Sequence, residues 1–195
     1  TSPEASETVM RPELSKAHLG IARDMDWARE HDLIEHVVYL AISSEIKVGG
    51  TRHHQVPTRW IDQGASFAIE LCRTPNRHIA GVIEVWLKNH FTDKTNWRAM
   101  LQNQIVTNVN LEEEKKNVLQ LLTPELQKYY SSDNKILEIS YPVSQYPEKL
   151  TSLSFDKDPE ISGILNGIKG QYLIFEGGGV LNIRKHNGYW LELDF

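Results

Sequence analysis

The feature that most constrains the fold is an apolar run at residues 36–42, HVVYLAI, followed closely by a second extended segment. Its β-branched and aromatic residues favour a strand, and the run is too short for an ordinary helix. Ser43 and Ser44 provide a turn before residues 45–49, and Gly49 and Gly50 end the second segment. Because a turn this short joins antiparallel neighbours, the sequence predicts an antiparallel strand pair.

The next eighty residues add a third strand and several helices. Pro57 suits a first helical position, so a short helix is predicted over residues 57–63. Residues 66–72 place apolar side chains at alternate positions, as a half-buried strand does. Further helices are predicted at residues 74–90, 97–104, 110–122 and 125–130. We therefore predict an α+β fold with a three-stranded antiparallel sheet flanked by helices.

The pattern changes after residues 131–134, whose sequence SSDN has the composition of a linker. The glycines at residues 177–179 indicate a tight hairpin. Strands are predicted beyond this linker at residues 136–141, 163–169, 172–175, 180–184 and 189–193. We expect an N-terminal arm at residues 1–35 with a short helix near its end, an α+β domain at 36–130, and a small all-β module at 131–195.

Composition excludes several classes of protein. The chain has 195 residues, of which 40% are hydrophobic and 24% charged, as in globular proteins. Its single cysteine, Cys72, permits neither an internal disulfide nor a cysteine-based metal site. No apolar run approaches the roughly 18 residues that a membrane helix requires. The first twenty residues lack the apolar stretch of a signal peptide. We therefore expect a cytoplasmic protein that does not enter a membrane.

The charge is distributed unevenly along the chain. Residues 47–103 contain eight lysines and arginines but four acidic residues, so this segment carries +4 although the whole chain carries −5. A basic segment in an acidic protein can meet an anion such as a phosphate backbone. Solvated surface charge clustered by chance is the alternative. DNA or RNA is the partner that this segment indicates, and no oligomeric state is predicted.

Four side chains in this part of the chain follow one another in a recognisable order. Tyr39 lies in the first strand, Lys47 in the second, Arg59 on the short helix and Glu84 on the main helix. Their order and approximate spacing over residues 36–103 resemble the GIY-YIG nuclease superfamily. The resemblance implies a GIY-YIG-like fold for this domain and a Mg²⁺-dependent endonuclease that hydrolyses phosphodiesters.

The roles of these residues are implied by the same resemblance. Tyr39 would orient or deprotonate water, Arg59 would stabilise charge on the phosphate, and Glu84 would hold Mg²⁺. Lys47 replaces the more common second tyrosine, and its protonated amine suits phosphate binding better than base catalysis. Further phosphate-binding candidates are Arg52, Arg77 and Lys94.

Each of these residues also has a purely structural interpretation. Tyr39 could pack in the core, and Arg59 could be an exposed helix residue. Glu84 lies among apolar neighbours, so a buried carboxylate there needs a partner, either a metal or an ion pair with Arg59 or Arg77. The alternatives to a nuclease are accordingly a non-catalytic nucleic-acid-binding module and a structural or protein-interaction protein.

A second resemblance covers nearly the whole chain, from about residue 11 to residue 189. It is to an uncharacterised bacterial family of unknown function. Four motifs carry it: KVGGTR at residues 47–52, PTRWIDQGA at 57–65, DKTNW at 93–97 and GQYLIF at 170–175.

Overall fold

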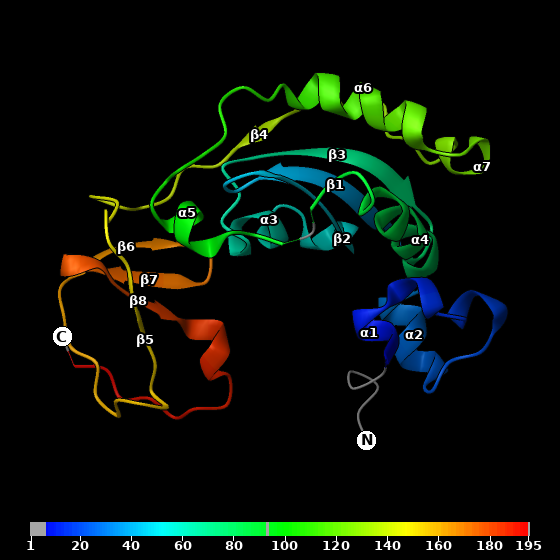
Figure 1. Ribbon diagram of the computed structural model, residues 1–195. Helices are drawn as coiled ribbons and strands as arrows, with labels where there is room; N and C mark the ends of the chain where they lie inside the picture. Colours follow the sequence, from blue (N-terminus) through cyan, green and yellow to red (C-terminus); the bar gives the residue numbers. More distant parts are fainter. Residues whose placement is uncertain (1–6, 93, 195) are drawn as a thin grey trace.

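The computed structural model of the protein describes residues 7–92 and 94–194. The first six residues of the predicted arm, the first residue of the DKTNW motif and the last residue of the chain lie outside this part. The described chain forms two four-stranded sheets with helices packed around the first of them (Figure 1). The fold class is therefore α+β, as predicted.

The first sheet has the strand order β2-β1-β3-β4, and every neighbouring pair is antiparallel. Its strands are β1 (His36–Ile42), β2 (Ile46–Arg52), β3 (Phe67–Thr74) and β4 (Leu137–Glu138). The predicted strand pair is confirmed, and its register sets Val38 opposite Gly50 and Tyr39 opposite Gly49. A bulge between Val38 and Tyr39 shifts the register of β1 against β3.

The predicted number of three strands is wrong, because β4 completes this sheet. The sequence placed residues 136–141 in the C-terminal module, but Leu137 pairs with Ala68 and Glu138 with Phe67 of β3. Leu137 and Ile139 pack against the cluster that contains Tyr39 and Trp60. The hydrophobic effect of burying these two side chains favours pairing of this segment with the first sheet.

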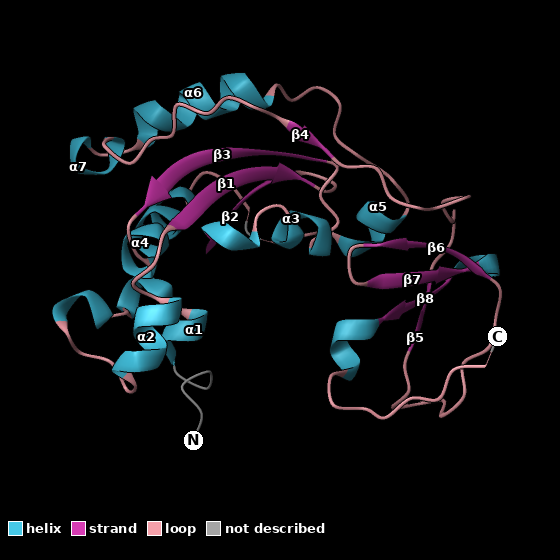
Figure 2. Ribbon diagram, turned by 180° about the vertical axis from the view of Figure 1, so that it is seen from behind, coloured by secondary structure: helices cyan, strands magenta, loops and turns pink. Residues whose placement is uncertain are grey.

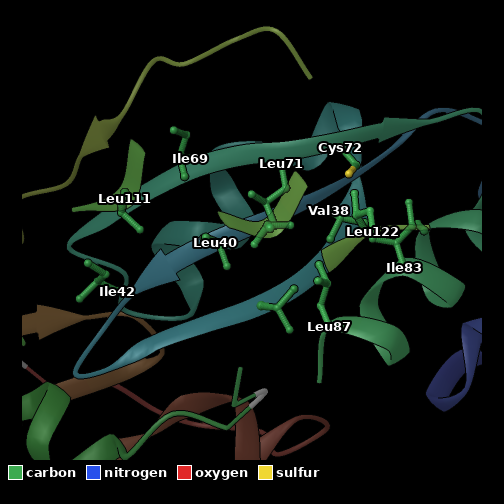
Figure 3. Packing of buried hydrophobic residues seen from close by; sticks show 13 residues of the cluster. Val38, Leu40, Ile42, Ile69, Leu71, Cys72, Ile83, Leu87, Leu111 and Leu122 are labelled. Carbon is green, nitrogen blue, oxygen red and sulfur yellow. The ribbon is translucent and has the colours of Figure 1, made fainter. Parts of the chain in front are cut away.

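The two faces of the sheet carry separate cores. One face packs Val38, Leu40 and Ile69 against the α4 and α6 helices (Figure 3). The other packs Val37 and Ala41 against the short α3 helix, which lies on the opposite side from α6 (Figure 1). The helices of this part are α3 (Thr58–Asp62), α4 (Arg77–Leu87), α5 (Trp97–Leu101), α6 (Leu111–Leu121) and α7 (Pro124–Gln127).

Side-chain caps fix where the longer helices begin. The α4 helix starts three residues later than predicted, because Thr74 still belongs to β3 and the Asn76 side chain accepts from the Ile79 N–H. The Asn110 side chain likewise accepts from the N–H groups of Glu112 and Glu113 at the start of α6.

The described part of the arm, residues 7–35, contains several short helices. These are α1 (Glu7–Met10), η2 (Pro12–Leu14), η3 (Ala17–Leu19) and α2 (Met25–His31). The η2 turn packs on α4 at Gly81, where an added Cβ would lie 2.5 Å from the backbone nitrogen of Glu13. A glycine in α4 thus permits the arm to approach the helix backbone. The predicted short helix near the end of the arm is confirmed by α2.

The second sheet has the order β5-β8-β7-β6 and lies beyond the end of the first sheet opposite the arm (Figure 2). Its strands are β5 (Thr151–Leu153), β6 (Leu165–Lys169), β7 (Tyr172–Phe175) and β8 (Gly179–Asn182). The turn at Gly177 and Gly178, with φ of 78° and 86°, joins β7 and β8 as predicted. The β5 strand, parallel to β8, was not predicted.

The predicted strand at residues 189–193 is wrong. These residues form no regular structure, and Trp190 is fully exposed. Beyond β8 the chain enters the 3₁₀ helix η6 (Ile183–His186) instead. Of the described helices, none combines the length and apolar character needed to cross a membrane.

The two sheets are joined by a small core and a tight backbone contact. Met100 and Leu101 of α5 pack with Ile174 and Val180 of the second sheet. Gly170, in the turn between β6 and β7, has a φ of 59°, and a Cβ there would lie 2.9 Å from the carbonyl oxygen of Asp62. These contacts hold the second sheet against the C-terminal end of α3.

Candidate functional site

Two adjacent glycines at the edge of the first sheet organise the candidate site. A Cβ at Gly49 would lie 2.7 Å from the Tyr39 hydroxyl, and a Cβ at Gly50 would lie 2.8 Å from Glu84 Oε2. Successive strand residues face opposite sides of a sheet. Tyr39 and Glu84 therefore approach the β2 backbone from its two faces, and they come near one another only because β2 is an edge strand.

Tyr39 is fully buried, and its hydroxyl donates to Gln63 Oε1 at 2.9 Å. Burial raises the pKa of Tyr39 to about 12, although the nearby Arg59 charge and hydrogen bonds from Arg59 and to Gln63 oppose the rise. The phenol therefore stays protonated near neutral pH. Of the two roles implied for Tyr39, orienting water is compatible with a protonated hydroxyl, and deprotonating water is not.

Glu84 lies on α4 with about a fifth of its side chain exposed. Its Oε1 atom forms an ion pair with Lys88 Nζ at 3.2 Å, one helical turn further along. The suggested structural pairing with Arg59 or Arg77 is not found. A partly exposed i,i+4 pair contributes only about 0.3–0.5 kcal/mol, so Glu84 is not needed to hold α4 in place.

A cavity of about 480 Å³ opens beside Gly50, lined by residues of the arm, β2, α3 and α4 and by Arg184 of η6. Arg59 and Glu84 line it together, so two of the predicted residues face the same space. Its charged lining consists of four arginines and two carboxylates: Arg52, Arg59, Arg77, Arg184, Asp62 and Glu84. Arg77 is also paired with the buried Asp32, at 3.8 Å from its Nε to Oδ1. The other three arginines still outnumber the two carboxylates, which suits this cavity to an anion.

A second cavity of about 390 Å³ adjoins the first, because Arg59, Asp62 and Arg184 line both. Lys47 lines this second space, and its Nζ donates to Thr95 Oγ1 at 2.8 Å. Lys47 and Glu84 therefore line different cavities, and Arg59 lines both.

The remaining predicted phosphate-binding residues divide into two groups. Arg52 and Arg77 line the first cavity, and each also contacts the N-terminal part of the chain. Arg52 Nε donates to the His31 carbonyl at 3.3 Å, and Arg77 Nη2 donates to the Val9 carbonyl at 2.8 Å. Lys94 is exposed on a loop and lines neither cavity.

The carboxylates of the first cavity limit what kind of metal ion it could hold. Within the described ranges, no group of three or more His, Cys, Asp or Glu side chains converges as metal ligands. Glu84 and Asp62 are the acidic residues in this lining. Mg²⁺ commonly takes one or two protein carboxylates and completes its coordination with water and substrate phosphates. The donor set fits that mode, with Glu84 Oε2 placed over Gly50.

A family model for proteins of unknown function, DUF2797, matches residues 1–191. The chain belongs to this family. The match confirms the resemblance to an uncharacterised family, whereas the GIY-YIG resemblance stays a prediction. Comparison with curated proteins and with solved structures gives no match.

The four motifs that suggested the family all contribute to the two cavities of this DUF2797 chain. The first two supply Lys47, Gly50 and Arg52 from β2, and Arg59, Asp62 and Gln63 from α3. The last two supply Thr95, Trp97, Gln171 and Tyr172. Motifs more than a hundred residues apart thus meet around one space.

Sequence reasoning missed several polar residues of the site, among them Gln63 and Arg184. Gln63 follows Arg59 by four residues at the end of α3, and this helical spacing could have indicated that both face Tyr39. Arg184 comes from η6 beyond the second sheet. Nothing in its local sequence marks Arg184, because its place beside Arg59 depends on how the two sheets dock.

Proposed function

We propose that this protein acts on nucleic acid and hydrolyses phosphodiesters with the help of Mg²⁺. The observation that carries the proposal is the meeting of Tyr39, Arg59 and Glu84 at the Gly49–Gly50 edge of β2. We also propose that the first sheet and its helices are a GIY-YIG-like domain with one strand added. The order of strands β1 to β3 and the positions of these three residues support that assignment.

Each residue has a physical role in this proposal. The Arg59 guanidinium opposes the negative charge that grows on a phosphate in the transition state. Tyr39 acts as a positioning residue, because its buried hydroxyl contacts both Arg59 and Gln63 and stays protonated. Glu84 would hold Mg²⁺ with its carboxylate, which lies beside Gly50. When bound, Mg²⁺ supplies positive charge and lowers the pKa of coordinated water.

Non-catalytic binding of nucleic acid is the second candidate function. It is favoured by the raised pKa of Tyr39, which deprives the site of one implied base, and by the pairing of Glu84 with Lys88. The four arginines of the first cavity would bind phosphates in the same way without cleavage.

The substitution Glu84→Gln separates the two candidates. The amide keeps the shape of the side chain but loses the charge that holds a hard cation. We expect Mg²⁺-dependent cleavage of a labelled oligonucleotide to fall by about a hundredfold or more, with binding kept within about twofold. The loss of the Lys88 ion pair should cost less than about 1 kcal/mol of unfolding free energy.

The matched control is Glu113→Gln, which removes an exposed carboxylate of α6 away from both cavities. Its cleavage rate should equal that of the parent protein. Binding by the parent without metal-dependent cleavage would leave only the second candidate. Absence of binding at low salt would contradict both.

A further inference from the structure

The second cavity is a cleft between the two sheets, lined by residues from both halves of the chain. Lys47 and Thr95 lie on the side of the first sheet, and Tyr172 and Asn182 lie on the side of the second. Arg184 follows Asn182 closely and extends this wall into the first cavity. The space beside Glu84 therefore continues into the cleft.

The contacts between the sheets fix the cleft before any ligand enters. Lys169 of β6 is fully buried and its Nζ donates to Asn103 Oδ1, after α5, at 2.9 Å. This polar contact adds to the apolar core around Met100 and to the close approach of Gly170 to Asp62. A preformed cleft avoids the ordering cost that binding would otherwise carry.

Arg184 is the cation of the second wall that is best placed to bind an anion. It is exposed, and among the described residues no carboxylate lies within ion-pair distance of its guanidinium. Arg59 and Lys47 face the same cleft from the first half of the chain. Positive groups thus stand on both sides of the cleft, with Asp62 as its acidic residue.

Flat aromatic surface accompanies these charges. The Trp97 ring of α5 and the Tyr172 ring of β7 are stacked, with centroids 5.7 Å apart and an angle of 10° between their planes. Both residues line the cleft and are half-buried, and the Arg98 guanidinium lies over the Trp97 ring, 4.2 Å from its centroid, so the Tyr172 ring is the one considered for base stacking. A positive groove with aromatic side chains is the combination that binds single-stranded nucleic acid, through phosphates and stacked bases.

We infer that the cleft is a channel for single-stranded nucleic acid, in which Arg184 binds the phosphate next to the one held by Arg59. The inference rests on the proposed function and specifies its substrate. Cavities of about 480 and 390 Å³ have the size of sites for small molecules. Such volumes suit the unpaired nucleotides of one strand, and we therefore expect the cleft to favour a single strand over a duplex.

The test compares Arg184→Ala with Lys185→Ala. Both residues are exposed neighbours on η6, and Lys185 lines neither cavity, so the two variants differ in the position of the lost charge. The probes are one labelled oligonucleotide, as DNA and as RNA, and the same strands annealed to their complements. Binding is measured at several salt concentrations.

We expect the parent protein to bind the single strand about tenfold more tightly than the duplex. Arg184→Ala should weaken single-strand binding about tenfold, as loss of a hydrogen bond to a charged group does, and should reduce the salt slope by about one. Lys185→Ala should bind within about twofold of the parent.

Equal effects of the two substitutions, or equal binding of strand and duplex, would overturn the inference. In either case cleavage that depends on Glu84 would persist if the proposed function is right. Failure of the single-strand inference can therefore be told apart from failure of the proposed function. A parent protein that binds none of these probes would overturn both.

Discussion

Two features of this chain depend on single residues: the close contacts of side chains with the backbone at Gly49 and Gly50, and the buried amine of Lys169. Gly49 and Gly50 leave room for Tyr39 and Glu84 against an edge strand. A side chain at Gly49 would collide with the buried Tyr39 ring, whereas one at Gly50 would displace the end of the Glu84 side chain. Lys169 is the opposite case. Its ammonium group is fully buried, bonded to Asn103 and placed 5.4 and 5.0 Å from the rings of Tyr141 and Tyr146.

The buried amine of Lys169 makes stability depend on pH. Burial lowers its pKa from 10.5 to about 8, so the unfolded chain binds this proton more tightly than the folded protein. The free energy of unfolding should therefore rise with pH between about 8 and 10.5, by at most about 3 kcal/mol from this group. Urea unfolding across this range measures the slope. Lys169→Met should lack this contribution, and an identical slope in parent and variant would contradict the prediction.

At the level of elements, the helix propensity of α4 and its packing against the arm make opposite demands on residue 81. Glycine inside a helix costs about 1 kcal/mol relative to alanine, so Gly81→Ala should favour α4 considered alone. A Cβ at this position, however, would lie 2.5 Å from Glu13 N and 2.7 Å from Pro12 C. Backbone atoms cannot rotate away as a side chain can, so the arm must move.

We therefore expect Gly81→Ala to loosen the arm. Limited trypsin digestion should cut faster after Lys16, which lies between the packed η2 turn and η3, and the melting temperature should fall. Gln120→Ala on the exposed face of α6 serves as control, since it raises helix propensity without meeting another element. A more stable Gly81→Ala protein with unchanged digestion would show that the arm adapts without cost.

For the whole molecule, the arrangement of charge matters more than its sum. The chain carries −5, yet cations gather at the two cavities: Lys47, Arg52, Arg59, Arg77 and Arg184. Arg184 lies outside the basic segment at residues 47–103, and several basic residues of that segment do not line the cavities. Arg73 is paired with Glu70, Lys88 is paired with Glu84, and Lys94 lies outside both cavities.

Binding of a single strand should consequently weaken steeply as salt rises. If three to five phosphates are neutralised, the slope of log K against log salt should be about −2 to −3.5. Lys94→Ala should leave this slope unchanged, because Lys94 is exposed and lines neither cavity. Binding measured from low to physiological salt checks both expectations. A flat dependence would rule out phosphate contacts as the main source of affinity.

The sequence by itself determined the elements whose signals are local. The apolar run of β1, the alternation in β3 and the helix starts near Pro57 and Asn110 are set by neighbouring residues, and the structure has them close to the predicted places. The resemblance to known nucleases selected Tyr39, Arg59 and Glu84, of which Arg59 and Glu84 line one cavity while the buried Tyr39 lies against Gly49 and lines neither cavity. The strands β4 and β5 are only two and three residues long, too short for their pattern to indicate a partner.

Tertiary structure alone decided which distant segments share a space. Residues 189–193 have an apolar pattern but form no strand, because β-propensity produces a strand only where a neighbour is available to pair. Arg184 reaches the site because a buried core around Met100 and Ile174 docks the second sheet against α3. Such long-range burial depends on the whole chain, so no local pattern around Arg184 could have revealed it.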